Sequence, residues 1–147
     1  MNMNVSSKTH IQASISAVAA NDLIEAARAG CGDIGIECTI AVTDNAGHLK
    51  AFHRADQAPF LTVEVAIDKA WTAASFGLAT HVWNAVIGNS EVAQLAHRPR
   101  LVAVGGGYPI LVEGKVVGGL GISGGNALQD QQACEMALKA GGFDLPE

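Results

Sequence analysis

The sequence contains few aromatic and few charged residues. Aromatic residues make up 5% of the 147 residues and charged residues 16%, whereas hydrophobic residues make up 49%. A chain this apolar and this weakly charged is not intrinsically disordered. Alanine and glycine together account for 42 residues. We therefore expect a core of small side chains in a single domain that spans residues 1–147.

Cysteine, positive charge and long apolar runs are also scarce. The three cysteines, Cys31, Cys38 and Cys134, lack zinc-ligand spacing and are too few for a disulfide scaffold, so we interpret them as small buried side chains. The five histidines show no metal-ligand spacing either, and we predict no metal site. A net charge of −5 leaves no basic stripe for nucleic acid. No apolar run is long enough for a membrane span, which predicts a cytoplasmic protein without a membrane partner.

Hydrophobic periodicity predicts an α/β (α+β) protein in the order α-β-β-α-(α)-β-β-β-α. Because hairpins connect most of the strands, we expect a five-stranded antiparallel sheet with helices packed on it. The first helix has cap candidates at Ser6, Ser7 and Thr9 and should stop at Gly30 and Gly32. The other predicted elements are strands at 36–43 and 49–54, a helix at 60–77, two short helices within 80–97, strands at 101–104, 108–112 and 115–123, and a last helix from 126 to 141.

Two glycine-rich segments are candidate ligand-binding loops. Gly105, Gly106 and Gly107, followed by Tyr108, lie between predicted strands, where either a turn or the close approach of a ligand or another chain requires glycine. The run 119–124 fits G-x-G-x-x-G, but no parallel strand can follow it, so we reject a dinucleotide site. The backbone amides of Ser123, Gly124 and Gly125 remain candidates for binding a carboxylate or phosphate, and the alternative is a plain strand-to-helix turn.

Charged residues suggest a second kind of site. Arg54 and Asp56 end a predicted strand, where side chains commonly reach the rim of a pocket. Lys69 and Thr72 share a face of the following predicted helix with apolar neighbours. A desolvated Lys69 is a candidate base or anion anchor, and the alternative is an ion pair with Asp56 or Glu64.

Several blocks of the chain, taken together, form a specific pattern. They are Ala41-Val42-Thr43-Asp44 with Gly47-His48-Leu49, Arg54-Ala55-Asp56, Ile67-Asp68-Lys69-Ala70 with Thr72-Ala73-Ala74 and Phe76, Gly105-Gly106-Gly107 with Pro109-Ile110, and residues 114–125. With these blocks the chain resembles the GlcG/HbpS family and is similar to the C-terminal domain of PduO-type proteins. The acidic pair usual near the start of the last helix in that family stands here as Gln129-Asp130.

The resemblance implies a profilin-like fold that assembles into homo-oligomers, often octamers. It also implies relatives that sense haem, that associate with haem or a corrinoid, or that belong to catabolic pathways. Three hypotheses follow. The first is a cofactor-independent enzyme or accessory protein for a small carboxylated metabolite, in which Arg54 binds the carboxylate, Lys69 polarises a carbonyl and Asp56 orients Arg54 or moves a proton. The second is a haem- or corrinoid-binding module, and the third is an assembly protein.

Overall fold

The chain alternates helices and hairpins around one antiparallel sheet. The computed structural model describes residues 7–147. Its elements are α1 (Ala17–Ile34), β1 (Thr39–Asp44), β2 (Leu49–Arg54), α2 (Leu61–Phe76), α3 (Thr80–Val86), the 3₁₀ helix η1 (Ala93–His97), β3 (Gly107–Val112), β4 (Lys115–Ser123) and α4 (Ala127–Ala140).

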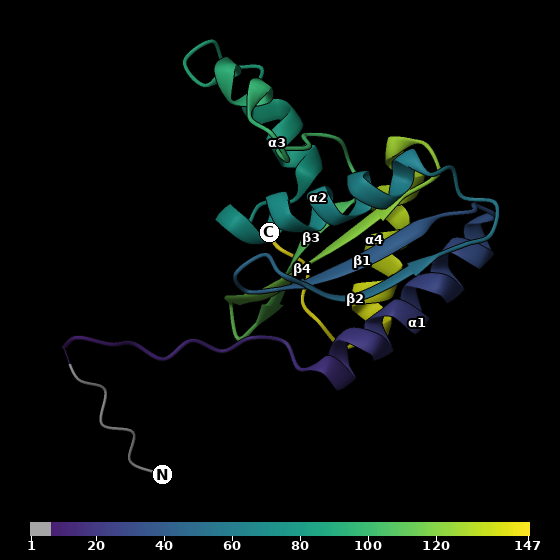
Figure 1. The fold of residues 1–147 in the computed structure, drawn as a ribbon, viewed down its shortest axis with the longest axis horizontal. Helices are drawn as coiled ribbons and strands as arrows, with labels where there is room; N and C mark the ends of the chain where they lie inside the picture. Colours follow the sequence, from purple (N-terminus) through teal and green to yellow (C-terminus); the bar gives the residue numbers. More distant parts are fainter. Residues whose placement is uncertain (1–6) are drawn as a thin grey trace.

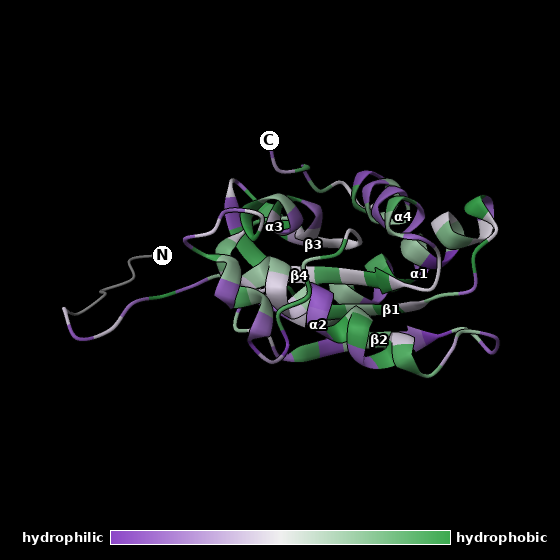
Figure 2. Ribbon diagram, turned by 90° about the horizontal axis from the view of Figure 1, so that it is seen from above, coloured by the Kyte–Doolittle hydropathy of each residue, from purple (hydrophilic) through white to green (hydrophobic). Residues whose placement is uncertain are grey.

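The sheet is the middle of three layers. Its four strands run in the order β2-β1-β4-β3, and all neighbours are antiparallel. Helix α2 covers one face, while α1 and α4 cover the other (Figures 1 and 2). Both hairpins turn through residues in the left-handed region, Gly47 in the first and Glu113-Gly114 in the second. The α+β class and the antiparallel sheet are therefore as predicted.

The larger apolar side chains gather on one side of the sheet. Residues such as Ile40, Leu120 and Ile122 point from the strands toward Leu23 of α1 and Leu138 of α4, and all five are at most 1% exposed. On the opposite face, α2 meets the sheet through alanine and glycine. The core thus has an aliphatic layer under α1 and α4 and a thin layer under α2.

The sheet has four strands and not five, because residues 101–104 do not form a strand. Thr72 on α2 forms hydrogen bonds with the backbone of this segment. Its hydroxyl donates to the Arg100 carbonyl (3.0 Å) and accepts from the Val102 amide (3.1 Å). The Ala103 carbonyl accepts from the Asn84 side chain (2.9 Å). Side chains thus bond backbone groups that a ladder would otherwise use.

The first helix begins later and ends later than predicted. Ser16 is its cap and accepts from the Ala19 amide (3.1 Å), whereas Ser7 and Thr9 precede the helix and Ser6 lies outside the described residues. Ile15 is held in an extended segment because its amide donates to the Val117 carbonyl (2.9 Å). Gly30 and Gly32 lie inside the helix, which ends at a left-handed Gly35.

Cys31 and Cys38 are joined in a disulfide, so reading them only as small buried side chains was wrong. The bond links the last turn of α1 to the residue before β1, seven positions apart. The spacing of the cysteines in the sequence does not predict this disulfide, because the bond depends on the path of the chain from the end of α1 to the start of β1. Cys134 is free and buried, as predicted.

Reduction of the disulfide is expected to lower the free energy of unfolding by about 2 kcal/mol, because closing so short a loop removes little entropy from the unfolded chain. Denaturant unfolding with and without reductant measures this difference, and the Cys31→Ala/Cys38→Ala variant is the control that should not respond to reductant. Unreduced, denatured protein should show one titratable thiol, that of Cys134. Three thiols would contradict the bond.

Cytoplasmic location stays a prediction, and a persistent disulfide is unusual in that compartment.

Candidate functional site

Lys69 is buried and paired. Its side chain is on α2, yet its ammonium donates to the carboxylate of Asp130 on α4 (3.1 Å) and to the Ile122 carbonyl of β4 (2.9 Å). Lys69 is 1% exposed and Asp130 2%. The ion pair therefore connects the helices on opposite faces of the sheet. The partner is neither Asp56 nor Glu64, the two carboxylates that sequence reasoning proposed.

The glycine loop before β3 makes room for this pair. A Cβ on Gly106 would lie 2.8 Å from the Lys69 nitrogen and 2.7 Å from the Asp130 Cβ, and Gly106 has a φ of 118°. A Cβ on Gly107 would lie 2.6 Å from the Thr80 methyl. A Cβ on Gly105 would lie 3.0 Å from the Ala127 carbonyl oxygen. Residues of the same chain therefore account for the close approach at these glycines.

The turn from β4 into α4 also forms a hydrogen bond with a side chain of the protein itself. The Gly125 amide donates to the second carboxylate oxygen of Asp130 (2.8 Å), so Asp130 binds an amide group of the loop that sequence reasoning assigned to an anion. Ser123 is 8% exposed at the end of β4, and Gly124 packs against the backbone of Glu37 and Cys38. The carboxylate that this turn binds comes from its own helix.

Tyr108 and Cys134 both lie next to the glycine loop 105–107. The Tyr108 hydroxyl donates to Glu135 (2.7 Å), and burial together with this bond raises the pKa of Tyr108. The Cys134 thiol donates to the Gly106 carbonyl (3.3 Å), and burial raises the pKa of that thiol. Both side chains therefore stay protonated at neutral pH, and Cys134 lies beside the Lys69–Asp130 pair.

Arg54 and Asp56 lie elsewhere, at the end of the edge strand β2 and in the loop that follows it. Arg54 is exposed, and its Nε donates to the Ala58 carbonyl (3.0 Å). Asp56 is exposed, and no bond joins it to Arg54 or Lys69 within residues 7–147. The structure therefore does not bring Arg54, Asp56 and Lys69 into one site. Groups of three or more histidine, cysteine or acidic side chains able to hold a metal ion are absent from the described part of the chain.

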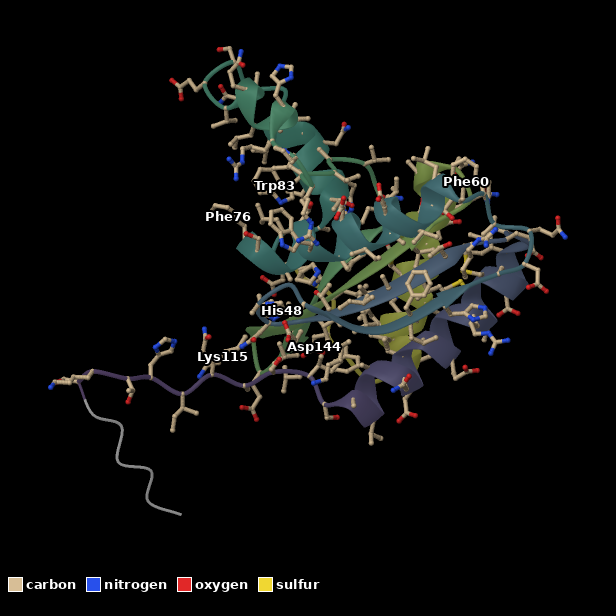
Figure 3. All side chains as sticks on the ribbon, viewed as in Figure 1. His48, Phe60, Phe76, Trp83, Lys115 and Asp144 are labelled. Carbon is tan, nitrogen blue, oxygen red and sulfur yellow. A yellow bond between two sulfur atoms is a disulfide. The ribbon has the colours of Figure 1, made fainter. Side chains whose placement is uncertain are left out.

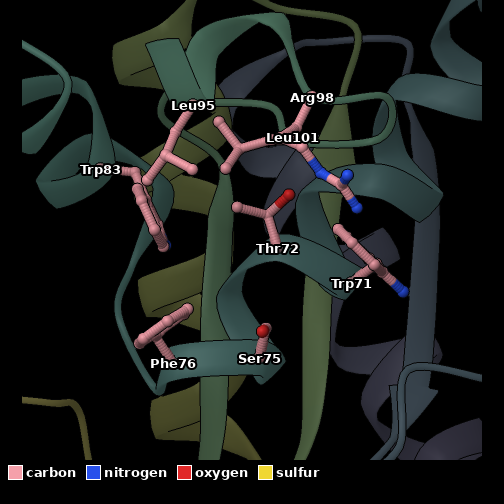
Figure 4. A pocket seen from close by; sticks show the side chains of 8 residues that line it. All are labelled: Trp71, Thr72, Ser75, Phe76, Trp83, Leu95, Arg98 and Leu101. Carbon is pink, nitrogen blue, oxygen red and sulfur yellow. The ribbon is translucent and has the colours of Figure 1, made fainter. Parts of the chain in front are cut away.

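A largely apolar hollow is one feature that sequence reasoning missed. It has a volume of about 190 Å³ and lies where α2 meets the projecting segment of α3 and η1 (Figures 1 and 4). Trp71 and Trp83 are the two tryptophans of the chain, and both line it. We call it the aromatic hollow. Its lining residues are Trp71, Thr72, Ser75, Phe76, Trp83, Leu95, Arg98 and Leu101.

Comparison with known proteins identifies the family of the chain. The family model for haem degrading protein HbpS-like matches residues 15–139. The chain belongs to this family. The motifs that resembled GlcG/HbpS proteins thus identified the family correctly. No helix in residues 7–147 is both long and apolar enough to cross a membrane.

Several known proteins are similar to the chain over most of its length. The uncharacterized 15.0 kDa protein of the dhaT-dhaS intergenic region in Citrobacter freundii is 33% identical over 129 residues, which are 86% of this chain and 91% of that one. Corrinoid adenosyltransferase PduO of the same organism is 32% identical over 123 residues, 82% of this chain but 37% of that protein. The solved complex of PduOC with haem has a TM-score of 0.81 and 26% identity, and covers 91% of this chain and 99% of that one.

Proposed function

We propose that this protein binds a tetrapyrrole, with haem as the first candidate. The observation that carries the proposal is the similarity to the PduOC–haem complex, which extends over 91% of this chain and 99% of that one. The family's description as haem degrading supports it. A corrinoid is the alternative within the same ligand class, because the chain is also similar to part of a corrinoid adenosyltransferase.

The size of the hollows favours an open site. Five hollows in the described part of the chain measure about 190 to 280 Å³ each. A cavity of about 150 Å³ is filled by one benzene molecule, and a tetrapyrrole has four linked rings and side chains. The ligand therefore lies on a surface, alone or shared with a second copy. Self-association up to an octamer, and with it the assembly hypothesis, stays a prediction.

Arg54 and the exposed pair Phe60-Leu61 form the surface that we assign to the tetrapyrrole. Phe60 is 87% exposed and Leu61 68%. The Arg54 guanidinium donates to the carbonyl of Ala58 (3.0 Å), which precedes Phe60 by two residues. Arginine binds carboxylates in two-point contacts, as a propionate requires, and the apolar pair can cover a flat ring. Phe60 stands at the end of α2 opposite Phe76 (Figure 3). Bound haem would supply a redox-active iron.

Titration of the full chain with haemin should give a saturable shift of the Soret band. Arg54→Ala is expected to weaken binding about threefold to fivefold, as for an exposed ion pair. Phe60→Ser is expected to weaken it about tenfold through lost apolar contact. Arg98→Gln, at the aromatic hollow, is the matched control and should bind haemin like the natural protein. Titration with cobalamin tests the corrinoid alternative. A spectrum that changes without saturating for both ligands would remove the proposal.

A further inference from the structure

The aromatic hollow has a buried donor without an acceptor. Trp83 is 4% exposed, and its indole nitrogen has no hydrogen-bond partner. The ring makes an edge-to-face contact with Phe76, with centroids 5.5 Å apart. Tryptophan is large and amphipathic, and its N–H group usually finds an acceptor when it is buried. The unpaired group therefore points to an acceptor supplied from outside the chain.

A second polar group at the hollow is a free cation. Arg98 is exposed and lines the hollow, and within residues 7–147 its guanidinium makes no ion pair or hydrogen bond. Its neighbour Arg100, by contrast, is paired with Asp68 (2.9 Å) and lies over the Trp71 ring at 4.5 Å. Figure 4 shows Trp83 and Phe76 on one side of the hollow and Trp71 and Arg98 on the other. Trp83 and Arg98 thus line one apolar hollow, the first with a buried N–H group and the second with an exposed guanidinium.

The segment that carries Arg98 is held in a strained conformation. Arg100 has a φ of 73°, which is uncommon for a residue other than glycine. Three side chains of α2 fix it there: Asp68 binds its guanidinium, Trp71 stacks under it, and the Thr72 hydroxyl bonds its carbonyl (3.0 Å). Strain that the surroundings hold in place is characteristic of functional sites. The hollow is therefore built before any ligand arrives.

We infer that the aromatic hollow binds a small planar carboxylate with a single aromatic ring. The volume of about 190 Å³ suits one ring and a short polar substituent, because an apolar cavity of about 150 Å³ binds benzene. The ring would pack among Phe76, Trp71 and Leu101, while the carboxylate accepts from Trp83 and pairs with Arg98. This inference is independent of the tetrapyrrole proposal, which uses a different surface.

Benzoate is the probe, because it is the smallest acid of this class. Both tryptophans line the hollow, so titration should change the intrinsic fluorescence saturably, and calorimetry should give one site per chain. Trp83→Phe, which keeps an aromatic ring and removes the N–H, is expected to weaken benzoate binding about tenfold. Arg98→Gln is expected to weaken it about threefold to fivefold, because Arg98 is exposed. Benzyl alcohol, which has no charge, should bind at least about tenfold more weakly than benzoate. Circular dichroism checks that each variant is folded.

Other results would overturn the inference. Benzoate binding that fails to saturate contradicts a site, and equal affinity for benzoate and benzyl alcohol shows an apolar hollow without carboxylate recognition. Arg54→Ala is the matched control and should leave benzoate affinity unchanged; a loss in that variant moves the site away from the hollow. The two proposals fail separately, since Arg54→Ala should affect haemin alone and Arg98→Gln benzoate alone. If benzoate displaces haemin, both ligands share the hollow and the surface assigned to the tetrapyrrole is wrong.

Discussion

Replacing Lys69 with methionine is expected to lower the free energy of unfolding by about 3–5 kcal/mol. Methionine fills most of the same volume but removes the charge, so the Asp130 carboxylate remains buried at 2% exposure without its cation. The Ile122 carbonyl loses a donor as well. For a domain of this size, the melting temperature should fall by roughly 10 °C. Thermal and denaturant unfolding followed by circular dichroism measure the effect.

A double-mutant cycle separates the ion pair from simple packing. Asp130→Asn should cost a similar amount because it leaves Lys69 charged and unpaired, while its side-chain oxygen can still accept from the Gly125 amide. The double variant Lys69→Met/Asp130→Asn buries no charge. It is therefore expected to be more stable than the sum of the two single losses predicts. Additive losses would show that the two residues act separately.

The ion pair also shows where sequence reasoning stopped. Lys69 was singled out correctly as a desolvated cation, since its neighbours on α2 are apolar. Its partner Asp130 is 61 positions away and on the other side of the sheet, so no helical spacing could identify it. The acidic pair usual near the start of the last helix was the available signal, because Asp130 belongs to it. The glycine at 106 was a second signal, since its missing side chain leaves space for the pair.

Elements whose pattern is local were predicted closely. Strands β2 and β4 have the predicted bounds, 49–54 and 115–123, because side-chain alternation and turn residues specify a hairpin. The segment 101–104 has the apolar composition of a strand, yet Thr72 and Asn84 bond its backbone. The aromatic hollow was missed for the same reason: α2, α3, η1 and the segment after η1 each supply part of it. Such arrangements depend on tertiary contacts, which one sequence does not reveal.

Part of the abundance of small residues is explained at the face of the sheet under α2. Gly121 lies at the centre of the sheet, opposite Ala41 on one neighbouring strand and Gly107 on the other. A Cβ there would collide with the Ala66 carbonyl oxygen and lie 2.7 Å from the Ala70 nitrogen, both backbone atoms of α2. Helix α2 therefore rests directly on the strand. Gly119 and Gly121 of β4 thus make room for α2, whereas a ligand was one of the alternatives open at the sequence level.

Gly121→Ala is consequently expected to destabilise the protein by about 3 kcal/mol or more, at the upper end of the cost of overpacking, because rigid backbone and not a flexible side chain must move. Gly32→Ala is the matched control: it lies in α1, its Cβ would meet no atom within 4 Å, and alanine favours a helix, so it should stabilise by about 0.5–1 kcal/mol. Denaturant unfolding of both variants measures whether each change lowers or raises the free energy of unfolding. Equal and small effects would mean that α2 can lift from the sheet without loss, and the close helix-to-strand contact would then not explain why glycine is required at this position.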